Sequence, residues 1–266
     1  MQDFQGVPDT LFIPLSARIY VSKRFPDYFH DPKCLELEKA LPENKLRNRS
    51  NQYQNFANVS CCFNMDRKVC NFIAEKGEVN IVNLGCGLDT SYWRIDDPRA
   101  AFYELDFPEV IANRRRVLGE SEREVLLPYS LTDLRWTQHL DKTKPTLLTA
   151  RGVFEYFHIE EVVAFLKAVR EELPYGEVVF DCPNSKGIGY TNRYVRKTGN
   201  LSALIHFFVD DAKRFADGCD CELLSEETFF TETRKIVKKG LTPYTRIAMW
   251  MVDHYGMGKI IHLRLK

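Results

Sequence analysis

From residue 79 to residue 182, short apolar runs alternate with longer segments whose apolar residues recur at helical spacing. Short apolar runs are typical of buried strands, and spacings of three and four residues are typical of amphipathic helices. Alternation of the two predicts βαβ units and a parallel sheet. The expected strands are Val79–Leu84, Ala101–Asp106, Glu124–Tyr129, Thr146–Ala150 and Glu177–Cys182, and the expected helices are Pro108–Leu118, Asp133–Leu140 and Ile159–Leu173.

The flanking segments are less regular. A helical region from about Thr10 to Lys76 precedes the sheet. After Cys182 come a helical patch at Ser202–Phe215 and two β-like runs, Arg246–Val252 and Lys259–Leu265. We expect one domain over residues 1–266, with an N-terminal cap (1–76), a cofactor-binding core (79–182), an insertion (183–244) and closing strands (245–266). The insertion is expected to cover the carboxyl edge of the sheet, where open α/β sheets bind ligands.

Composition narrows the function classes. Apolar residues make up 44% and charged residues 28% of the chain, and 37 basic residues balance 37 acidic ones. This balance gives no reason to expect nucleic acid as a partner. The segment Met1–Pro14 lacks the pattern of a signal peptide, and the sequence contains no membrane-length apolar run. The eight cysteines are poorly spaced for zinc. We therefore expect a cytoplasmic protein without a metal site. The oligomeric state is left open.

The most informative segment, Asn83–Thr90, follows the first expected strand. Gly85 and Gly87 within it allow the backbone to turn sharply and to approach a ligand closely. About twenty residues further on, the second strand ends at Asp106, a position where an acid accepts hydrogen bonds from a ribose diol. The order of strand, glycine turn, helix, strand and acid predicts a cofactor that contains adenosine. The usual dinucleotide fingerprint has a third glycine where this chain has Thr90, so a nicotinamide cofactor is the weaker alternative.

Six segments in register carry a resemblance to the leucine carboxyl methyltransferase superfamily. They are Thr10–Arg18, Val82–Thr90, Tyr103–Glu109, Ser130–Asp133, Gly152–Tyr156 and Gly176–Asp181. The sequence is most similar to the bacterial branch that contains the tetracenomycin-type polyketide O-methyltransferases. The resemblance implies a Rossmann-like class I methyltransferase sheet, with S-adenosylmethionine as cofactor and a small molecule as methyl acceptor.

The resemblance also implies roles for individual residues. Gly85, Cys86 and Gly87 would line the methionine and ribose part of the cofactor. Asp106 would hold the ribose hydroxyls, and Arg18 would face the cofactor's carboxylate. Three residues would flank the adenine, and Tyr156 would lie near the transferred methyl group. The adenine residues are Ser130, Leu131 and Asp133.

Two positions depart from the family pattern. The fourth-strand motif usually reads Ala-Glu-Gly-Val, but Arg151 replaces the glutamate here. An arginine of the family falls on Cys61. The two changes would compensate if Arg151 contacted the cofactor's carboxylate in place of the missing arginine. They are also compatible with a remodelled site, and with a protein that binds the cofactor without turnover.

Methyl transfer from a sulfonium is a direct displacement, in which the acceptor must be held in line with the methyl group. A carboxylate acceptor needs no base, whereas a hydroxyl acceptor benefits from one. The candidate bases are His158 and His206. The aromatic residues of the insertion are expected either to line a substrate wall or to form the insertion's own core, and these are Tyr190, Tyr194, Phe207 and Phe208. The run Arg114–Arg116 is expected to be a solvated helix face with an ion pair.

Overall fold

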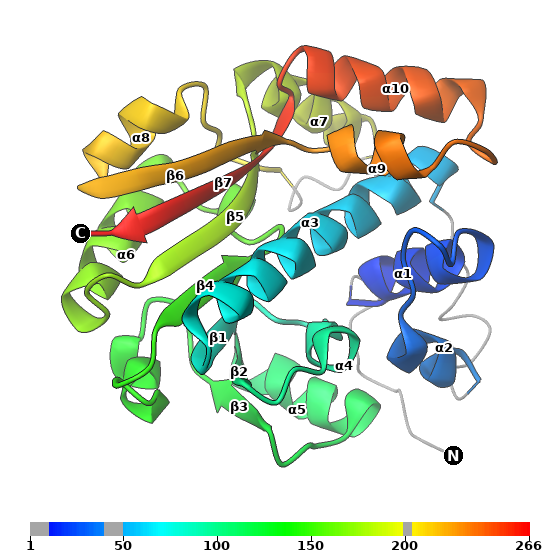
Figure 1. Ribbon diagram of the computed structural model, residues 1–266. Coiled ribbons are helices and arrows are strands. Elements are labelled where there is room, and N and C mark those ends of the chain that lie inside the picture. Colours follow the sequence, from blue (N-terminus) through cyan, green and yellow to red (C-terminus); the bar gives the residue numbers. More distant parts are fainter. Residues whose placement is uncertain (1–10, 40–49, 199–203) are drawn as a thin grey trace.

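The computed structural model of the 266-residue chain describes residues 11–39, 50–198 and 204–266. A seven-stranded sheet with the order β3-β2-β1-β4-β5-β7-β6 forms its centre (Figure 1). β1 to β5 are parallel, and β7 is antiparallel to both β5 and β6. The strands are β1 (Val79–Leu84), β2 (Ala100–Asp106), β3 (Glu124–Pro128), β4 (Thr146–Ala150), β5 (Glu177–Pro183), β6 (Cys221–Thr228) and β7 (Gly258–Leu265).

Helices cover both faces of the sheet because its central strands are buried on both sides. Every residue of β1 and β4 is buried. Val82 and Leu84 face a cluster that includes α6 and α8, whereas Ile81 faces a cluster that includes α3. The helices are α1 (Phe12–Arg24), α2 (Pro32–Glu38), α3 (Gln52–Lys76), α4 (Ser91–Ile95), α5 (Pro108–Leu118), α6 (Ile159–Glu172), α7 (Ser185–Thr198), α8 (Ala212–Gly218), α9 (Thr231–Ile236) and α10 (Pro243–His254). None of the helices in these ranges is long and apolar enough to cross a membrane.

The long helix α3 links the sheet to the N-terminal helices. Asn51 and Gln54 form a reciprocal capping box at its start, and its C-cap is Gly77. Its C-terminal half packs Val69 and Phe72 against the sheet. Its N-terminal half packs against α1, and Figure 1 shows α1 and α2 beside that half. The N-terminal helices are thereby placed over one edge of the sheet.

The register of the parallel strands brings chemically important residues to that edge. Leu84 of β1 lies opposite Leu105 of β2 and Ala150 of β4, and Ala150 lies opposite Phe180 of β5. The residues that follow these partners therefore meet at the carboxyl edge of the sheet. They are Gly85, Asp106, Arg151 and Asp181.

The structure confirms the mixed α/β class and the five parallel strands, with bounds within one residue of those expected. The expected strand at Arg246–Val252 is wrong, because this segment lies in α10. Thr242 caps α10 and Pro243 occupies its first turn. Helix α8 begins only at Ala212, so the predicted helical patch at Ser202–Phe215 is wrong over its described residues 204–211; residues 202 and 203 lie outside the described ranges.

Candidate cofactor and acceptor site

The glycine turn after β1 has a conformation that favours glycine. Gly85 and Gly87 have φ values of +60° and +48°, in the left-handed region. A Cβ at Gly85 would come within 2.7 Å of a Val153 methyl carbon. Asp106 fastens the turn, since its Oδ2 accepts a hydrogen bond from the Gly87 amide (2.9 Å). The turn is thus tied to the acid that sequence reasoning assigned to the ribose.

Arg114 donates hydrogen bonds to the backbone of the same turn. The expectation that the arginine run is solvated is wrong for this residue. Arg114 is wholly buried, whereas Arg115 is exposed. The Arg114 guanidinium donates hydrogen bonds to the carbonyl oxygens of Gly87 (3.2 Å) and Asp89 (2.6 Å). It also pairs with the buried Glu124, so the predicted ion pair is present. A buried cation therefore holds the backbone of the turn.

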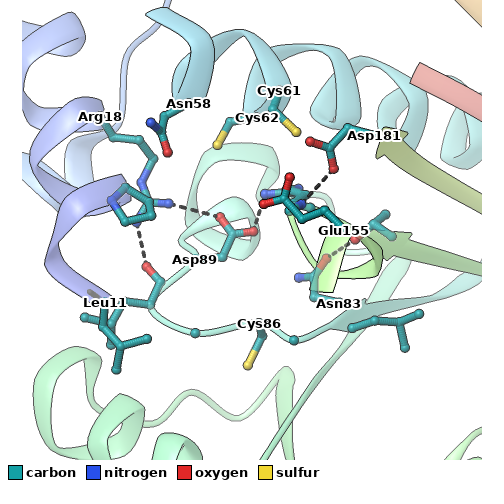
Figure 2. Close-up of a pocket in the computed structure, with 18 of the residues that line it drawn as sticks. Leu11, Arg18, Asn58, Cys61, Cys62, Asn83, Cys86, Asp89, Glu155 and Asp181 are labelled. Atoms are coloured by element: carbon teal, nitrogen blue, oxygen red, sulfur yellow. Dashed lines mark hydrogen bonds and ion pairs between the residues drawn. The ribbon is translucent and has the colours of Figure 1, made fainter. Parts of the chain in front are cut away.

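A cavity of about 500 Å³ lies beside the glycine turn. This volume is within the range of small-molecule sites. Figure 2 shows Arg18 and Asp89 facing one another, with Glu155 and Asp181 together on another side of the pocket. The lining residues are Leu11, Pro14, Arg18, Ala57, Asn58, Cys61, Cys62, Asn83, Leu84, Gly85, Cys86, Gly87, Leu88, Asp89, Thr149, Arg151, Gly152, Glu155, Tyr156, Asp181 and Phe229.

Six ionised side chains form an arginine–aspartate cluster at this cavity. Its members are Arg18, Arg94, Arg151, Asp31, Asp66 and Asp89. Arg94 pairs with Asp66 (2.7 Å) and with Asp31 (3.0 Å). Burial opposes ionisation of Asp89, but the charges of Arg151, Arg94 and Arg18 hold its pKa well below the usual range. Three cations balance three anions, which makes this buried cluster tolerable.

Arg151 is the member of the cluster with hydrogen-bonding capacity to spare. One of its terminal nitrogens pairs with Asp89, and the other lies 3.4 Å from Asp66. Its buried Nε and Nη2 donate no hydrogen bond to any described residue. These two nitrogens have almost no accessible surface, so a ligand in the cavity could reach only the other atoms of Arg151 that line it. Cys61 lines the same cavity, so the two departures from the family pattern share one site.

Glu155 and Asp181 form a pair of carboxyl groups that sequence reasoning missed. Burial and the charge of Asp181 raise the pKa of Glu155 to about 7. Burial also raises the pKa of Asp181, whose Oδ1 accepts a hydrogen bond from the Gly152 amide (2.7 Å). Asp181 gave a signal in the sequence as the acid near the end of the fifth strand. Glu155 gave none, because only the fold brings it to Asp181.

The two carboxyl groups also line a second cavity of about 370 Å³. Both cavities share Ala57, Glu155, Asp181 and Phe229. The other described lining residues of the second cavity carry no charge, and most are aromatic or aliphatic. They are Tyr53, Cys182, Pro183, Gly187, Tyr190, Thr191, Ile205, Phe230, Tyr244, Ile247, Ala248, Met251, Val252, Met257 and Gly258. α7 and α10 thus supply much of its wall.

The remaining predicted catalytic residues fall into two groups. Tyr156 lines the first cavity and is 53% exposed. The rings of His158 and His206 lie 4.6 Å apart on the surface, and neither residue lines either cavity. The His206 backbone nevertheless matters, since its amide donates a hydrogen bond to the Glu155 carbonyl oxygen (2.7 Å).

The predicted adenine residues do not line the first cavity. Ser130, Leu131 and Asp133 follow β3, two strands away from β1 in the sheet, and Asp133 pairs with Arg135 (2.5 Å). Of the insertion aromatics, Tyr190 lines the second cavity and Phe207 is in the core. Phe208 is exposed, and the side chain of Tyr194 lies outside the described part of the structure.

Comparison with known proteins shows the family to which the chain belongs. A family model described as leucine carboxyl methyltransferase matches residues 9–170. The chain belongs to the leucine carboxyl methyltransferase family. The tetracenomycin polyketide synthesis O-methyltransferase TcmP of Streptomyces glaucescens is 26% identical over 177 residues, which make up 66% of each chain. The chain therefore spans just under two thirds of that relative's length.

Solved structures show the same fold. A putative methyltransferase from Thermobifida fusca YX superposes with a TM-score of 0.61 at 16% identity, and the match covers 99% of this chain and 100% of that chain. An S-adenosylmethionine-dependent methyltransferase from Mesorhizobium loti has a TM-score of 0.52 at 19% identity, over 77% of this chain and 97% of that one. At these identities the two structures show the fold, and the family is shown by the match over residues 9–170.

Proposed function

We propose that the chain is a cytoplasmic S-adenosylmethionine-dependent O-methyltransferase that acts on a small, largely apolar molecule. The observation that carries this proposal is a pair of cavities that meet at Glu155 and Asp181. One cavity offers a glycine turn and arginine donors, which suit a charged cofactor. The other offers aromatic and aliphatic walls, which suit an apolar acceptor.

The residues of the first cavity fit S-adenosylmethionine. When bound, this cofactor supplies a methyl group on a positively charged sulfur. Arg151 and Arg18, which both line this cavity, would hold its carboxylate. The turn from Gly85 to Gly87 leaves space where side chains would clash, and Asp106 would accept from the ribose hydroxyls. By resemblance to the family, the adenine would lie near Ser130, Leu131 and Asp133, outside the lining of the first cavity.

The protein's own contribution to such a reaction is positioning and exclusion of water. The second cavity would hold the acceptor with its oxygen toward the shared carboxyl pair, and its apolar wall would keep bulk water away. Tyr156 would close the first cavity on its exposed side. All eight cysteines are free thiols, which supports the cytoplasmic assignment.

Two other functions fit the structure less well. A protein that binds the cofactor without turnover would not need a second cavity that adjoins the cofactor cavity. A nicotinamide enzyme is disfavoured at Thr90, which is buried and donates a hydrogen bond to Asp31 (2.5 Å). The side chain at this position therefore contacts the arginine–aspartate cluster, whereas a dinucleotide turn would have its third glycine here.

Parallel ligand titrations test the proposal. We expect S-adenosylmethionine and S-adenosylhomocysteine each to raise the unfolding midpoint and to give a saturable heat of binding, whereas NAD should do neither. Transfer of a radiolabelled methyl group to aromatic hydroxyl compounds then tests turnover. Tighter binding of NAD than of both sulfur ligands would contradict the proposal, and binding without transfer to any acceptor would favour the non-catalytic alternative.

A further inference from the structure

Basic side chains gather on two segments of a chain whose charges balance overall. The segment 185–198, which forms α7, carries four basic residues and no acidic one. The segment 234–246, which runs from α9 into α10, carries five basic residues and no acidic one. Figure 1 shows α7, α9 and α10 grouped at one end of the molecule. Positive charge is therefore concentrated at that end.

Most of these cations have no acidic partner. The two cations of α9 pair with acids. By contrast, Arg193, Arg196 and Lys239 are exposed and form no ion pair with any described residue. Arg246 is exposed as well, and its guanidinium donates a hydrogen bond to the Lys238 carbonyl oxygen (2.8 Å) and not to a carboxylate. Exposed cations without partners attract an anionic surface within about one Debye length.

The same helices expose apolar side chains. Half of the exposed large apolar side chains in the described part of the chain lie on α7, α9 and α10 or at the C-cap of α10. Ile247, Trp250 and Met251 recur at helical spacing along the outer face of α10, whereas Thr245 and Met249 are buried on its inner face. Grouped apolar side chains on a surface mark contact with a partner or with a membrane. The full set is Tyr190, Ile236, Tyr244, Ile247, Trp250, Met251 and Tyr255.

α7 and α10 meet at the opening of the second cavity. Asn184, directly before α7, donates a hydrogen bond to the Tyr255 carbonyl oxygen (2.9 Å), and the Lys186 ammonium lies 5.6 Å from the centre of the Tyr255 ring. Tyr190 and Ile247 line the second cavity and are also exposed, so the cavity opens between these helices. The basic–apolar face beside this opening consists of Lys186, Tyr190, Arg193, Arg196, Lys239, Arg246, Ile247, Trp250 and Met251.

Charge and polarity together select the partner of this face. A second copy of the chain would bring cations against cations, which opposes self-association there. Nucleic acid would neutralise the cations but would leave the side chains of Ile247 and Met251 without an apolar partner. An anionic lipid surface offers both partners, because its headgroups attract Lys and Arg while its interface accommodates Trp, Tyr and aliphatic side chains.

We propose that the basic–apolar face docks the protein reversibly on a membrane surface that contains anionic lipids. Trp250 and its apolar neighbours on α10 would enter the headgroup region, and the cations of α7 and of residues 234–246 would contact lipid phosphates. The opening of the second cavity would then face the lipid, from which an apolar molecule can enter it. This docking goes beyond the proposed function and does not depend on it.

Vesicle flotation with the full chain tests the inference. The vesicles consist of phosphatidylcholine alone, or of equal parts of phosphatidylcholine and phosphatidylglycerol. The charge variant carries three reversals on the basic–apolar face, Arg193→Glu, Arg196→Glu and Lys239→Glu. The charge control makes the same change in net charge at exposed cations outside α7, α9 and α10, by Arg115→Glu, Arg135→Glu and Lys142→Glu.

Trp250 reports whether the face itself enters the lipid. Of the three tryptophans, Trp250 is the exposed one, and it lines neither cavity. A blue shift of the tryptophan emission on addition of vesicles therefore arises from this residue. Trp250→Ser removes the reporter and part of the apolar contact, and Tyr175→Ser is its control at another exposed aromatic residue.

We expect the parent to float with the anionic vesicles and not with phosphatidylcholine alone, with an affinity that falls as salt is added. The charge variant should lose about tenfold or more in its partition onto anionic vesicles. Trp250→Ser should show a smaller loss and no blue shift, and both controls should match the parent. Without vesicles, every variant should bind S-adenosylhomocysteine as the parent does, which shows that it is folded.

Equal vesicle binding by the parent and the charge variant would overturn the inference, and so would an equal loss in the charge control. Binding to soluble polyglutamate as tight as that to anionic vesicles, without a shift of the Trp250 emission, would overturn it in favour of an acidic protein partner. A parent dimer that the charge variant dissociates would overturn it in favour of a second copy.

If the charge variant fails to fold, the salt titration of the parent decides, and vesicle binding that does not depend on salt overturns the inference. A parent that binds anionic vesicles but no S-adenosylhomocysteine would leave the docking in place and overturn the proposed function. A parent that binds S-adenosylhomocysteine but no anionic vesicles would do the reverse.

Discussion

At the scale of single residues, Arg151 is the clearest departure from the family and lies where a departure matters. It replaces an acid with a cation at the edge of the sheet, and Asp89 and Asp66 partly neutralise it. Its place in the lining of the first cavity supports a role in binding the carboxylate of the cofactor. Cys61 lines the same cavity. The two changes together therefore move a positive charge from position 61 to position 151.

Arg151→Gln should weaken S-adenosylhomocysteine binding by about 1.5–3 kcal/mol, because hydrogen bonds to a charged group are lost. Adding Cys61→Arg should restore part of the loss, as expected of coupled residues. Calorimetry provides the dissociation constants, and Arg99→Gln, at an exposed ion pair, is the matched control. An affinity equal to that of the parent would mean that Arg151 serves only the arginine–aspartate cluster.

Asp106→Ala should weaken the same ligand by about 1–3 kcal/mol, since it removes the acceptor for the ribose and the tie to Gly87. Asp106→Asn keeps one acceptor oxygen, so it should lose less. Both variants should unfold near the parent's midpoint, because Asp106 ends a strand and is only partly buried. Unchanged affinity in a folded Asp106→Ala protein would place the ribose elsewhere.

Glu155 should also leave a signature in the stability of the protein without ligand. A carboxyl whose pKa is higher in the folded state contributes stability at low pH, and loses it as the pH rises from the unfolded pKa to the folded one. For Glu155 that loss ends near its raised pKa of about 7. Glu155→Gln should therefore unfold at the parent's midpoint at about pH 3.5 and above it at about pH 8. Equal midpoints at both values would show that its pKa is not raised.

At the scale of elements, the turn after β1 depends on glycine for two separate reasons, strain and space. Gly85→Ala adds a left-handed alanine and a clash with Val153. Gly119→Ala adds the same kind of strain in open space at the end of α5. Both variants should lose about 1 kcal/mol of stability from strain. Only Gly85→Ala should lose more and also lose S-adenosylhomocysteine binding, measured by thermal shift. Equal effects of the two changes would remove the packing argument.

The elements that were predictable are those with an unambiguous pattern. β1 and β4 are short, buried on both faces, rich in apolar residues and followed by glycine or by a polar edge residue, so their bounds were accurate. α10 was misread because its apolar residues also suit a strand, and its cap at Thr242 was overlooked. β6 was missed because its edge position tolerates several glutamates, which mask the alternation.

The residues of the candidate site likewise differ in how far the sequence predicts them. Gly85 and Gly87, which line the first cavity, were predictable because a local turn carries their chemistry. The ribose role of Asp106 stays a prediction, since this residue ends β2 and does not line that cavity. Arg114 and Glu155 were not predictable, because their surroundings depend on contacts between distant segments. Arg114 is buried only because α5 packs its guanidinium against the turn and Glu124. The pKa of Glu155 is raised by its burial and by the charge of Asp181, which β5 brings to it.

At the scale of the whole molecule, the chain places two cavities of different character against one sheet edge. α1, α3 and the strand ends build the charged cavity, whereas α7, α10 and the Phe229–Phe230 segment supply much of the apolar one. Figure 1 shows α7, α9 and α10 grouped at one end of the molecule, beside the upper part of α3. We propose that cofactor and acceptor meet at the carboxyl groups shared by these cavities.

A crystal structure of the chain with S-adenosylhomocysteine tests this claim most directly. We expect the ligand's carboxylate to contact Arg151 in the first cavity, its ribose to contact Asp106, and its sulfur to face the junction at Glu155 and Asp181. A ligand seated in the second cavity, or one whose sulfur points away from the two carboxyl groups, would contradict it.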